Sequence, residues 1–481
     1  MKTRIVLGYA AMLAVTVALY LVIRWYGEGL GAPITDLVQP SIGHGGGAGT
    51  FAPVLLALAV ITVATQGVGW LFRRFLRQPP VMGEIVAGIV LGPSVLGALW
   101  PAAGAFVLPD AAAPYLGIVA KIGVVLFMFL VGLELDLSQI RRQGHATIAI
   151  SHASIVTPFL LGSAAALVLY RSYAPPGIGF TAFSLFVGVS MSVTAFPVLA
   201  RILTDRGVQR TPLGALALSC AAVDDVTAWT LLAFVAGVAT AHGSGFLWVV
   251  GWVAAYLLAM LAVVRPLVSR LAAAQNRLDG PLSKPVLAVI CVAMLLSALA
   301  TEAIGIHALF GAFLLGAMLP HDGRLAELVR ARIEDLVLVL FLPAFFAFTG
   351  MRTRIGLVDT PHDWLICALI IGVATAGKFG GSYVAARLVG MKHRDASAIG
   401  VLMNTRGLME LIVLNVGLDM GILSPTLFAM MVIMALVTTF STTPALDAVL
   451  GRRGFDPEPF VGGPHPGPFV GEGPGPSRAA G

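Results

Sequence analysis

The stretch SVTAFPVLARIL, residues 192–203, places a proline and small polar residues inside a long apolar segment. Pro197 removes a backbone donor and clashes with the preceding helical turn, so a helix is interrupted there; taken alone, it also fits an ordinary proline kink. A second stretch, MNTRGLMEL at residues 403–411, interrupts another apolar run near its middle. The residues that we assign to these two breaks are Thr194, Pro197, Asn404, Thr405, Arg406 and Gly407.

The composition places both breaks in a membrane protein. Of the 481 residues, 58% are hydrophobic and 11% are charged, whereas soluble domains carry about 25% charge. Cys220, Cys291 and Cys367 all lie in apolar runs, so neither a disulfide framework nor a zinc site is supported. We therefore expect an all-α polytopic membrane protein and not a soluble enzyme.

Apolar segments of about 20 residues, enough to cross a bilayer, occupy almost the whole chain. About fourteen spans are predicted, at residues 5–23, 51–72, 80–99, 113–135, 146–170, 178–203, 212–238, 245–268, 284–301, 304–320, 333–351, 363–389, 396–418 and 424–449.

The distribution of cations predicts the orientation of these spans. With a cytoplasmic N-terminus, the outer loops hold only Arg24, Arg171, Arg352 and Arg354, and most other cations fall inside, as the positive-inside rule requires. Residues 1–50 are then an N-terminal anchor helix and outer loop, with a cleaved signal peptide as the alternative for residues 5–23, and residues 51–450 form a domain of 13 helices. The Gly- and Pro-rich residues 451–481 cannot bury a core and are predicted to be a disordered tail. Both termini are expected in the cytoplasm.

The two broken spans are the sixth and the thirteenth, seven spans apart. Because seven is odd, the corresponding spans cross the membrane in opposite directions. This is the arrangement of an inverted-topology repeat, in which broken helices at matching positions mark a midplane binding site. Unwound backbone at that depth must be buried in protein or line a cavity.

Three ionisable residues lie deep in predicted spans, where an unpaired charge is costly and therefore suggests function. Asp224 and Asp225 stand in the seventh span and Lys378 in the twelfth. Neighbouring positions on a helix point about 100° apart, so one aspartate can pair with Lys378 while the other faces a cavity. The alternative is a structural ion pair that only sets the register of the helices.

Other charged residues are weaker candidates. Arg406 and Glu410 are four residues apart, a spacing that allows a side-chain pair on one helix face. Structural roles are expected for the remaining ionisable residues of the spans, which are Glu84, Lys121, Glu134, Asp136 and His307.

Several of these stretches together resemble the monovalent cation:proton antiporters of the second CPA branch, which includes Kef-type and CHX-type proteins. The resemblance covers about residues 50–450. It rests on QPPVMGEIVAGIVLGPSVLG, LFMFLVGLELD, SVTAFPVLARIL, AAVDDVTAW, HALFGAFLLGAMLP, FFAFTGMRT, GKFGG and MNTRGLMELIVLNVGLDMGILSPTLFAMMV.

The resemblance implies an inverted-repeat antiporter fold with two crossed discontinuous helices, and it implies residue roles. Asp225 would carry the sodium or potassium ion and the proton, and Asp224 would pair with Lys378. Such exchange needs one carboxylate with a pKa near the working pH. A homodimer is also implied. No cofactor is expected, because the chain lacks the GxGxxG unit of the nucleotide-binding domain that Kef-type proteins usually append.

The rival function is an ion channel or ion-sensing membrane protein without obligatory exchange. The sequence alone does not separate sodium from potassium, nor does it give the coupling ratio.

Overall fold

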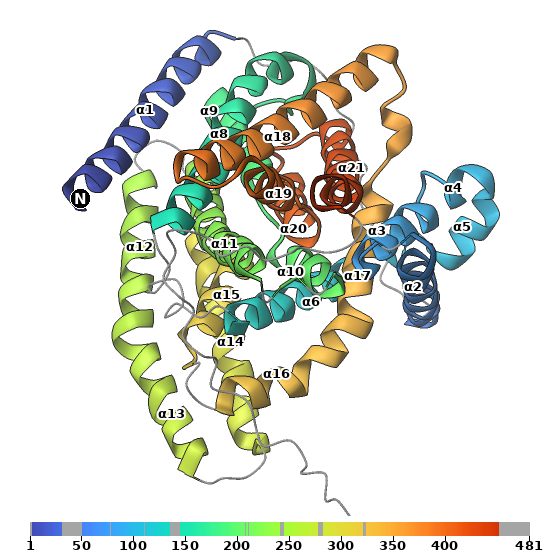
Figure 1. Cartoon of the computed structure of the whole chain (residues 1–481). Coiled ribbons are helices and arrows are strands. Elements are labelled where there is room, and N and C mark those ends of the chain that lie inside the picture. The colour runs from blue at the N-terminus through green and yellow to red at the C-terminus, as the bar shows by residue number, and fades with distance from the viewer. Residues whose placement is uncertain are drawn as a thin grey trace, which may run out of the picture.

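A computed structural model describes residues 2–30, 51–76, 78–109, 111–134, 145–206, 208–209, 211–240, 245–277, 282–320 and 324–451. All of the regular secondary structure in these ranges is helical (Figure 1). Asp136, most of the predicted outer loop and the predicted tail after residue 451 lie outside the described residues.

Twelve described helices are long and apolar enough to cross a membrane, and a pair bent by 42° makes a thirteenth. The predicted span at residues 304–320 is shorter than expected. This segment forms the helix α15 (Ala308–Met318) of 11 residues. The preceding helix α14 (Lys284–Ile304) is terminated by Gly305, which has a φ of 92°. The prediction of fourteen spans therefore depends on whether this short helix counts as one.

Eight helices pack together around the two breaks, and we call them the site bundle. They are α8 (His145–Tyr173), α9 (Phe180–Ser192), α10 (Phe196–Asp205), α11 (Pro212–Thr240), α18 (Pro361–Leu388), α19 (His393–Met403), α20 (Leu408–Asp419) and α21 (Pro425–Leu450).

A second group of helices packs beside the site bundle, and we call it the flanking bundle (Figure 1). In addition to α14 and α15, it contains α2 (Phe51–Leu71), α3 (Pro80–Leu91), α4 (Leu96–Leu99), α5 (Pro101–Val107), α6 (Ala113–Glu134), α12 (Gly245–Ala259), α13 (Arg265–Arg277), α16 (Arg324–Leu336) and α17 (Leu342–Arg352). Three short π-helical segments directly follow α2, α12 and α16, and they are Phe72–Leu76, Met260–Val264 and Val337–Phe341. A 3₁₀ turn, Ile355–Leu357, follows α17.

Glycine allows the helices of the flanking bundle to approach closely. A Cβ atom on Gly350 of α17 would lie 2.1 Å from the backbone carbon of Gly88 in α3. That separation is far shorter than a van der Waals contact. The contact between α3 and α17 therefore requires glycine at residue 350.

The N-terminal helix α1 (Lys2–Glu28) packs on α8 and α9 of the site bundle. The Tyr20 hydroxyl lies 3.4 Å from the carbonyl oxygen of Thr181, and its ring lies 5.9 Å from the ring of Phe159. This helix therefore lies against the bundle that carries the breaks.

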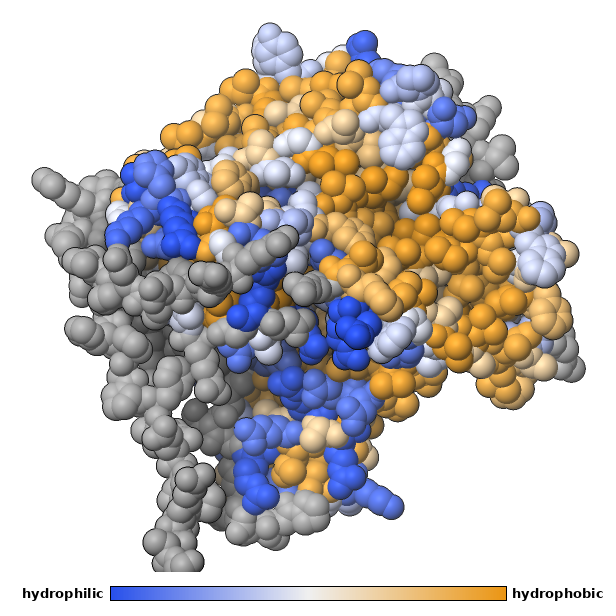
Figure 2. Space-filling model, turned by 45° about the vertical axis from the view of Figure 1, so that its right-hand side comes forward, coloured by the Kyte–Doolittle hydropathy of each residue, from blue (hydrophilic) through white to orange (hydrophobic). Residues whose placement is uncertain are grey.

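The surface shows where apolar side chains face outward. Figure 2 shows a broad apolar area over the side of the molecule that carries α2 and α5. The large exposed residues of these helices include Phe51, Val63, Trp70 and Phe106. Such a continuous apolar surface is expected where a protein contacts lipid.

Candidate functional site

The two breaks lie side by side in the site bundle. Helix α9 ends at Ser192 and α10 begins at Phe196, so Pro197 stands in the first turn of α10, where proline needs no backbone donor. The amide of Ala195 donates a 3.0 Å hydrogen bond to the carbonyl oxygen of Thr405 in the other break. This hydrogen bond therefore satisfies a backbone donor of the first break and a backbone acceptor of the second.

The second break separates α19 from α20 at residues 404–407. Gly407 has a φ of 148°, and a Cβ atom there would lie 2.9 Å from a methyl carbon of Val198 in α10. Both the backbone conformation and the close approach favour glycine. The turn at Gly407 thus sets the start of α20 against the first break.

Asp224 of α11 is fully buried, and both of its carboxylate oxygens are hydrogen-bonded. Its Oδ1 accepts from the Ser151 hydroxyl at 2.5 Å. Its Oδ2 accepts from Ser154, from the Thr194 hydroxyl at 2.8 Å and from the Lys378 ammonium at 3.1 Å. The charge of Asp224 is therefore compensated by one cation and three hydroxyl groups.

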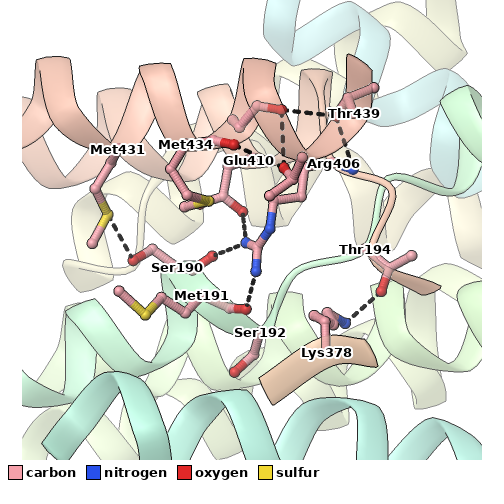
Figure 3. A network of polar contacts seen from close by, with 12 residues as sticks. Ser190, Met191, Ser192, Thr194, Lys378, Arg406, Glu410, Met431, Met434 and Thr439 are labelled. Carbon is pink, nitrogen blue, oxygen red and sulfur yellow. Dashed lines mark hydrogen bonds and ion pairs between the residues drawn. The ribbon is translucent and has the colours of Figure 1, made fainter. Parts of the chain in front are cut away.

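Lys378 reaches this carboxylate from α18. A capping box between Thr360 and Asp363 begins that helix, and the Lys378 side chain is fully buried. Its ammonium also donates to the Thr194 hydroxyl at 2.5 Å (Figure 3). Lys378 thus joins α18 both to Asp224 and to the first break.

Asp225 is the next residue of α11, yet its surroundings differ. Its side chain is 3% exposed, and its Oδ1 is buried without a hydrogen-bond partner among the described residues. A buried carboxylate oxygen without a donor is costly unless a proton or a cation satisfies it. Of the two neighbouring aspartates, Asp225 is the one with an oxygen available to a ligand.

Arg406 is fully buried at the second break and links the two broken helices (Figure 3). Its guanidinium donates to Glu410 at 2.9 Å, to the Ser190 carbonyl at 3.2 Å and to the Met191 carbonyl at 2.6 Å. Ser190 and Met191 belong to the last turn of α9, whose carbonyls lack helical partners and carry partial negative charge. Arg406, which lies in the second break, therefore neutralises the partial negative charge at the C-terminal end of α9.

The second break contains further polar oxygens that lack hydrogen-bond partners in the described part of the chain. Asn404 Oδ1 and Thr405 Oγ1 are buried and lack a partner within the described ranges. Among the described residues, no cluster of three or more His, Cys, Asp or Glu side chains forms a site for a tightly held metal. Buried oxygens without a partner among the described residues thus occur on Asp225, Asn404 and Thr405, and also on the Glu410 carboxylate.

The weaker candidates lie elsewhere. Glu134 pairs with Arg330 at 2.8 Å, and Lys121 pairs with Asp419 at 2.9 Å. His307 caps α15 by accepting a 3.5 Å hydrogen bond from the Leu309 amide. Glu84 lies in α3 and is buried.

The sequence interpretation missed the hydroxyl groups around Asp224. Ser151 and Ser154 are three residues apart in α8 and therefore lie on the same helix face. Two serines at this spacing in an apolar span could have indicated a buried charge nearby. Nothing in the spacing showed which charge they bind.

Comparison with known proteins agrees with this geometry. The family described as "Sodium/hydrogen exchanger, transmembrane" matches residues 57–448. The chain belongs to this family. Members of the family are transporters.

Named relatives of this exchanger family come from several organisms. The chain is 44% identical over 398 residues to "Na(+)/H(+) antiporter NhaS4" of Synechocystis, which covers 82% of this chain and 96% of that protein. It is 39% identical to "Cation/H(+) antiporter 20" of Arabidopsis thaliana, with 83% of this chain and 48% of the relative covered. It is 35% identical to "K(+)/H(+) antiporter 1" of Saccharomyces cerevisiae, with 78% and 44% covered. The chain therefore spans nearly the whole of the first relative and about half of the other two.

The fold also matches that of a solved exchanger. The sodium proton antiporter MjNhaP1 from Methanocaldococcus jannaschii superposes with a TM-score of 0.58 at 14% identity, covering 82% of this chain and 97% of that one. At this identity the likeness concerns the fold alone. The predicted inverted-repeat antiporter fold with two broken helices is thereby confirmed.

Proposed function

We propose that this protein exchanges sodium, potassium or both for protons by alternating access, with Asp225 as the carrier. The observation that carries the proposal is the contrast between the two neighbouring aspartates. Asp224 is saturated by Lys378 and three hydroxyl groups, whereas Asp225 keeps a buried oxygen without a partner in the described part of the chain.

Exchange follows if a cation and a proton compete for Asp225. Sodium and potassium ions favour oxygen ligands, and the unpartnered oxygens of Asn404 and Thr405 are further candidates for a partly dehydrated ion. If the site changes sides only when it is loaded, a cation that enters must be balanced by protons that leave. The contacts of Arg406 with Glu410, Ser190 and Met191 would keep the unwound backbone in place through the cycle.

Asp224 and Lys378 are proposed to have a supporting role. The pair fixes α11, α18 and the first break relative to one another through Thr194. Release of Lys378 from Asp224 when the cation binds would add a second proton-binding group to the cycle. Net charge would then cross the membrane.

We propose a cell-membrane location with both termini in the cytoplasm, on the basis of the distribution of Lys and Arg described above. A homodimer is proposed from the resemblance to the second CPA branch. Cross-linking of the purified protein in membranes would test the dimer, and labelling of terminal tags in oriented vesicles would test the topology.

Reconstitution into vesicles tests the exchange. An imposed gradient of Na⁺, K⁺ or Li⁺, applied in turn, should drive a pH change inside the vesicles, and the most effective ion identifies the substrate. Cation flux without any pH change would support a channel in place of an exchanger.

A further inference from the structure

A charged cluster joins the two bundles far from Asp225. Asp419, the last residue of α20, lies 2.9 Å from the Lys121 ammonium of α6 and 2.7 Å from the Arg352 guanidinium of α17. Helix α20 belongs to the site bundle, and α6 and α17 belong to the flanking bundle. One carboxylate therefore holds two cations across the boundary between the bundles.

Two further hydrogen bonds reinforce this connection. Arg352 also donates to the Asn415 side-chain oxygen at 3.0 Å, and the Asn415 amide donates to the Thr349 hydroxyl of α17 at 2.9 Å. Asn415 stands one helical turn before Asp419 on the same face of α20. The outer half of the second broken helix is thus fastened to α17 at two successive turns.

A cavity of about 130 Å³ lies beneath the cluster. Lys121, Arg352 and Asp419 line it together with apolar side chains that include Val124, Phe345 and Val416. Its walls come from α6 and α17, from α20, and from Glu302 of α14 and His307 just before α15. Separation of the two bundles at this end would widen this partly open cavity and expose Val416, which is buried in its wall.

Two neutral contacts join the bundles at the opposite end of the boundary. The Gln78 amide, just before α3, donates to the Phe440 carbonyl of α21 at 3.3 Å, and the ring of Phe72 lies 5.6 Å from that of Phe440. The contacts at the other end, in contrast, include two ion pairs that share one carboxylate.

We propose that Lys121, Asp419 and Arg352 form an ionic latch that closes the outer end of the transport pathway. The proposal rests on the exchange by alternating access proposed above, because the latch must open each time Asp225 faces outward. It assigns to Asp419 a positioning role, not contact with the transported ion. Weakening the latch should increase the fraction of molecules that are open to the outside.

Accessibility of the cavity tests the latch directly. Cys220, Cys291 and Cys367 are first replaced by alanine, and Val416→Cys, at a position that is 2% exposed, then reports on the cavity. The reporter is labelled in right-side-out vesicles with a membrane-impermeant thiol reagent. We expect Asp419→Asn to raise the labelling rate about ten-fold, which corresponds to about 1.4 kcal/mol.

Matched variants separate the latch from general damage. Asp419→Glu keeps the charge and should restore slow labelling, and Asp359→Asn removes an exposed carboxylate after α17 and should leave the rate unchanged. An unaltered rate in Asp419→Asn would overturn the latch. Labelling does not require transport, so that result would leave the exchange by Asp225 intact.

A second experiment applies if Asp419→Asn proves too unstable. Lys121→Cys combined with Asp419→Cys, in the same cysteine-free background, is bridged with a short bifunctional thiol reagent that reduction can cleave. Bridging should stop transport, and reduction should restore it. Full transport by the bridged protein would contradict the proposal, because a closed latch could not then be a step of the cycle.

Discussion

The contacts of Arg406 lead to a quantitative prediction for the pair with Glu410. Replacement by Arg406→Gln removes the bonds to Glu410, Ser190 and Met191 and leaves a fully buried carboxylate without its cation. Removal of one partner from a buried ion pair costs about 3–5 kcal/mol. We therefore expect a loss of about 4 kcal/mol in the free energy of unfolding.

Glu410→Gln should cost less, because Arg406 keeps the two carbonyl groups of α9. One hydrogen bond to a charged group is worth about 1.5–3 kcal/mol, so the expected loss is about 2 kcal/mol. In the double variant neither charge is left unpaired. Its loss should be about 3 kcal/mol, well below the sum of about 6 kcal/mol for independent sites.

The three variants are compared by reversible unfolding in mixed detergent micelles, followed by fluorescence of the tryptophans. Losses that add to within about 0.5 kcal/mol would refute the reasoning, because residues that interact must show coupling. The rate of exchange in vesicles provides a second measurement. Arg406→Ala should weaken transport by displacing the second break, and unaltered kinetics would mean that Arg406 does not position it.

Three further outcomes are expected. Asp225→Asn should abolish exchange while the protein remains folded, because the amide binds no proton and offers no full charge; coupled exchange in vesicles by this variant would exclude Asp225 as the carrier. Lys378→Gln should lower thermal stability and reduce the voltage dependence of transport, as measured by solid-supported-membrane currents. An undiminished current per transported cation would mean that Lys378 has only a structural role. Gly350→Ala should lower the free energy of unfolding by about 1–3 kcal/mol or more through overlap with α3, and therefore also the melting temperature, while the matched Gly356→Ala, where a Cβ atom would meet nothing within 4 Å, should change neither.

Local chemistry explains which parts of this arrangement could be predicted from the sequence. Proline disfavours a continuous helix and glycine permits unusual backbone conformations, so Pro197 and Gly407 together indicated the two breaks. The odd spacing of seven spans then indicated the inverted repeat. The sequence also showed that one aspartate could pair with Lys378, but only the resemblance indicated Asp224.

Contacts between distant segments could not be predicted in this way. Lys121 and Asp419 are separated by about 300 positions and lie near helix ends, where charged residues usually face the membrane surface. Neither spacing nor composition indicates that they meet. The short α15 was also misjudged, because the apolar run continues past Gly305, and only the reversal of the backbone there ends α14.

The position of α1 makes it a natural place for an optical reporter. Since α1 packs on α8 and α9, a donor dye on α1 would travel with the site bundle, and an acceptor dye on α13 would stay with the flanking bundle. Resonance energy transfer between the two dyes would then follow the relative displacement of the bundles in single molecules.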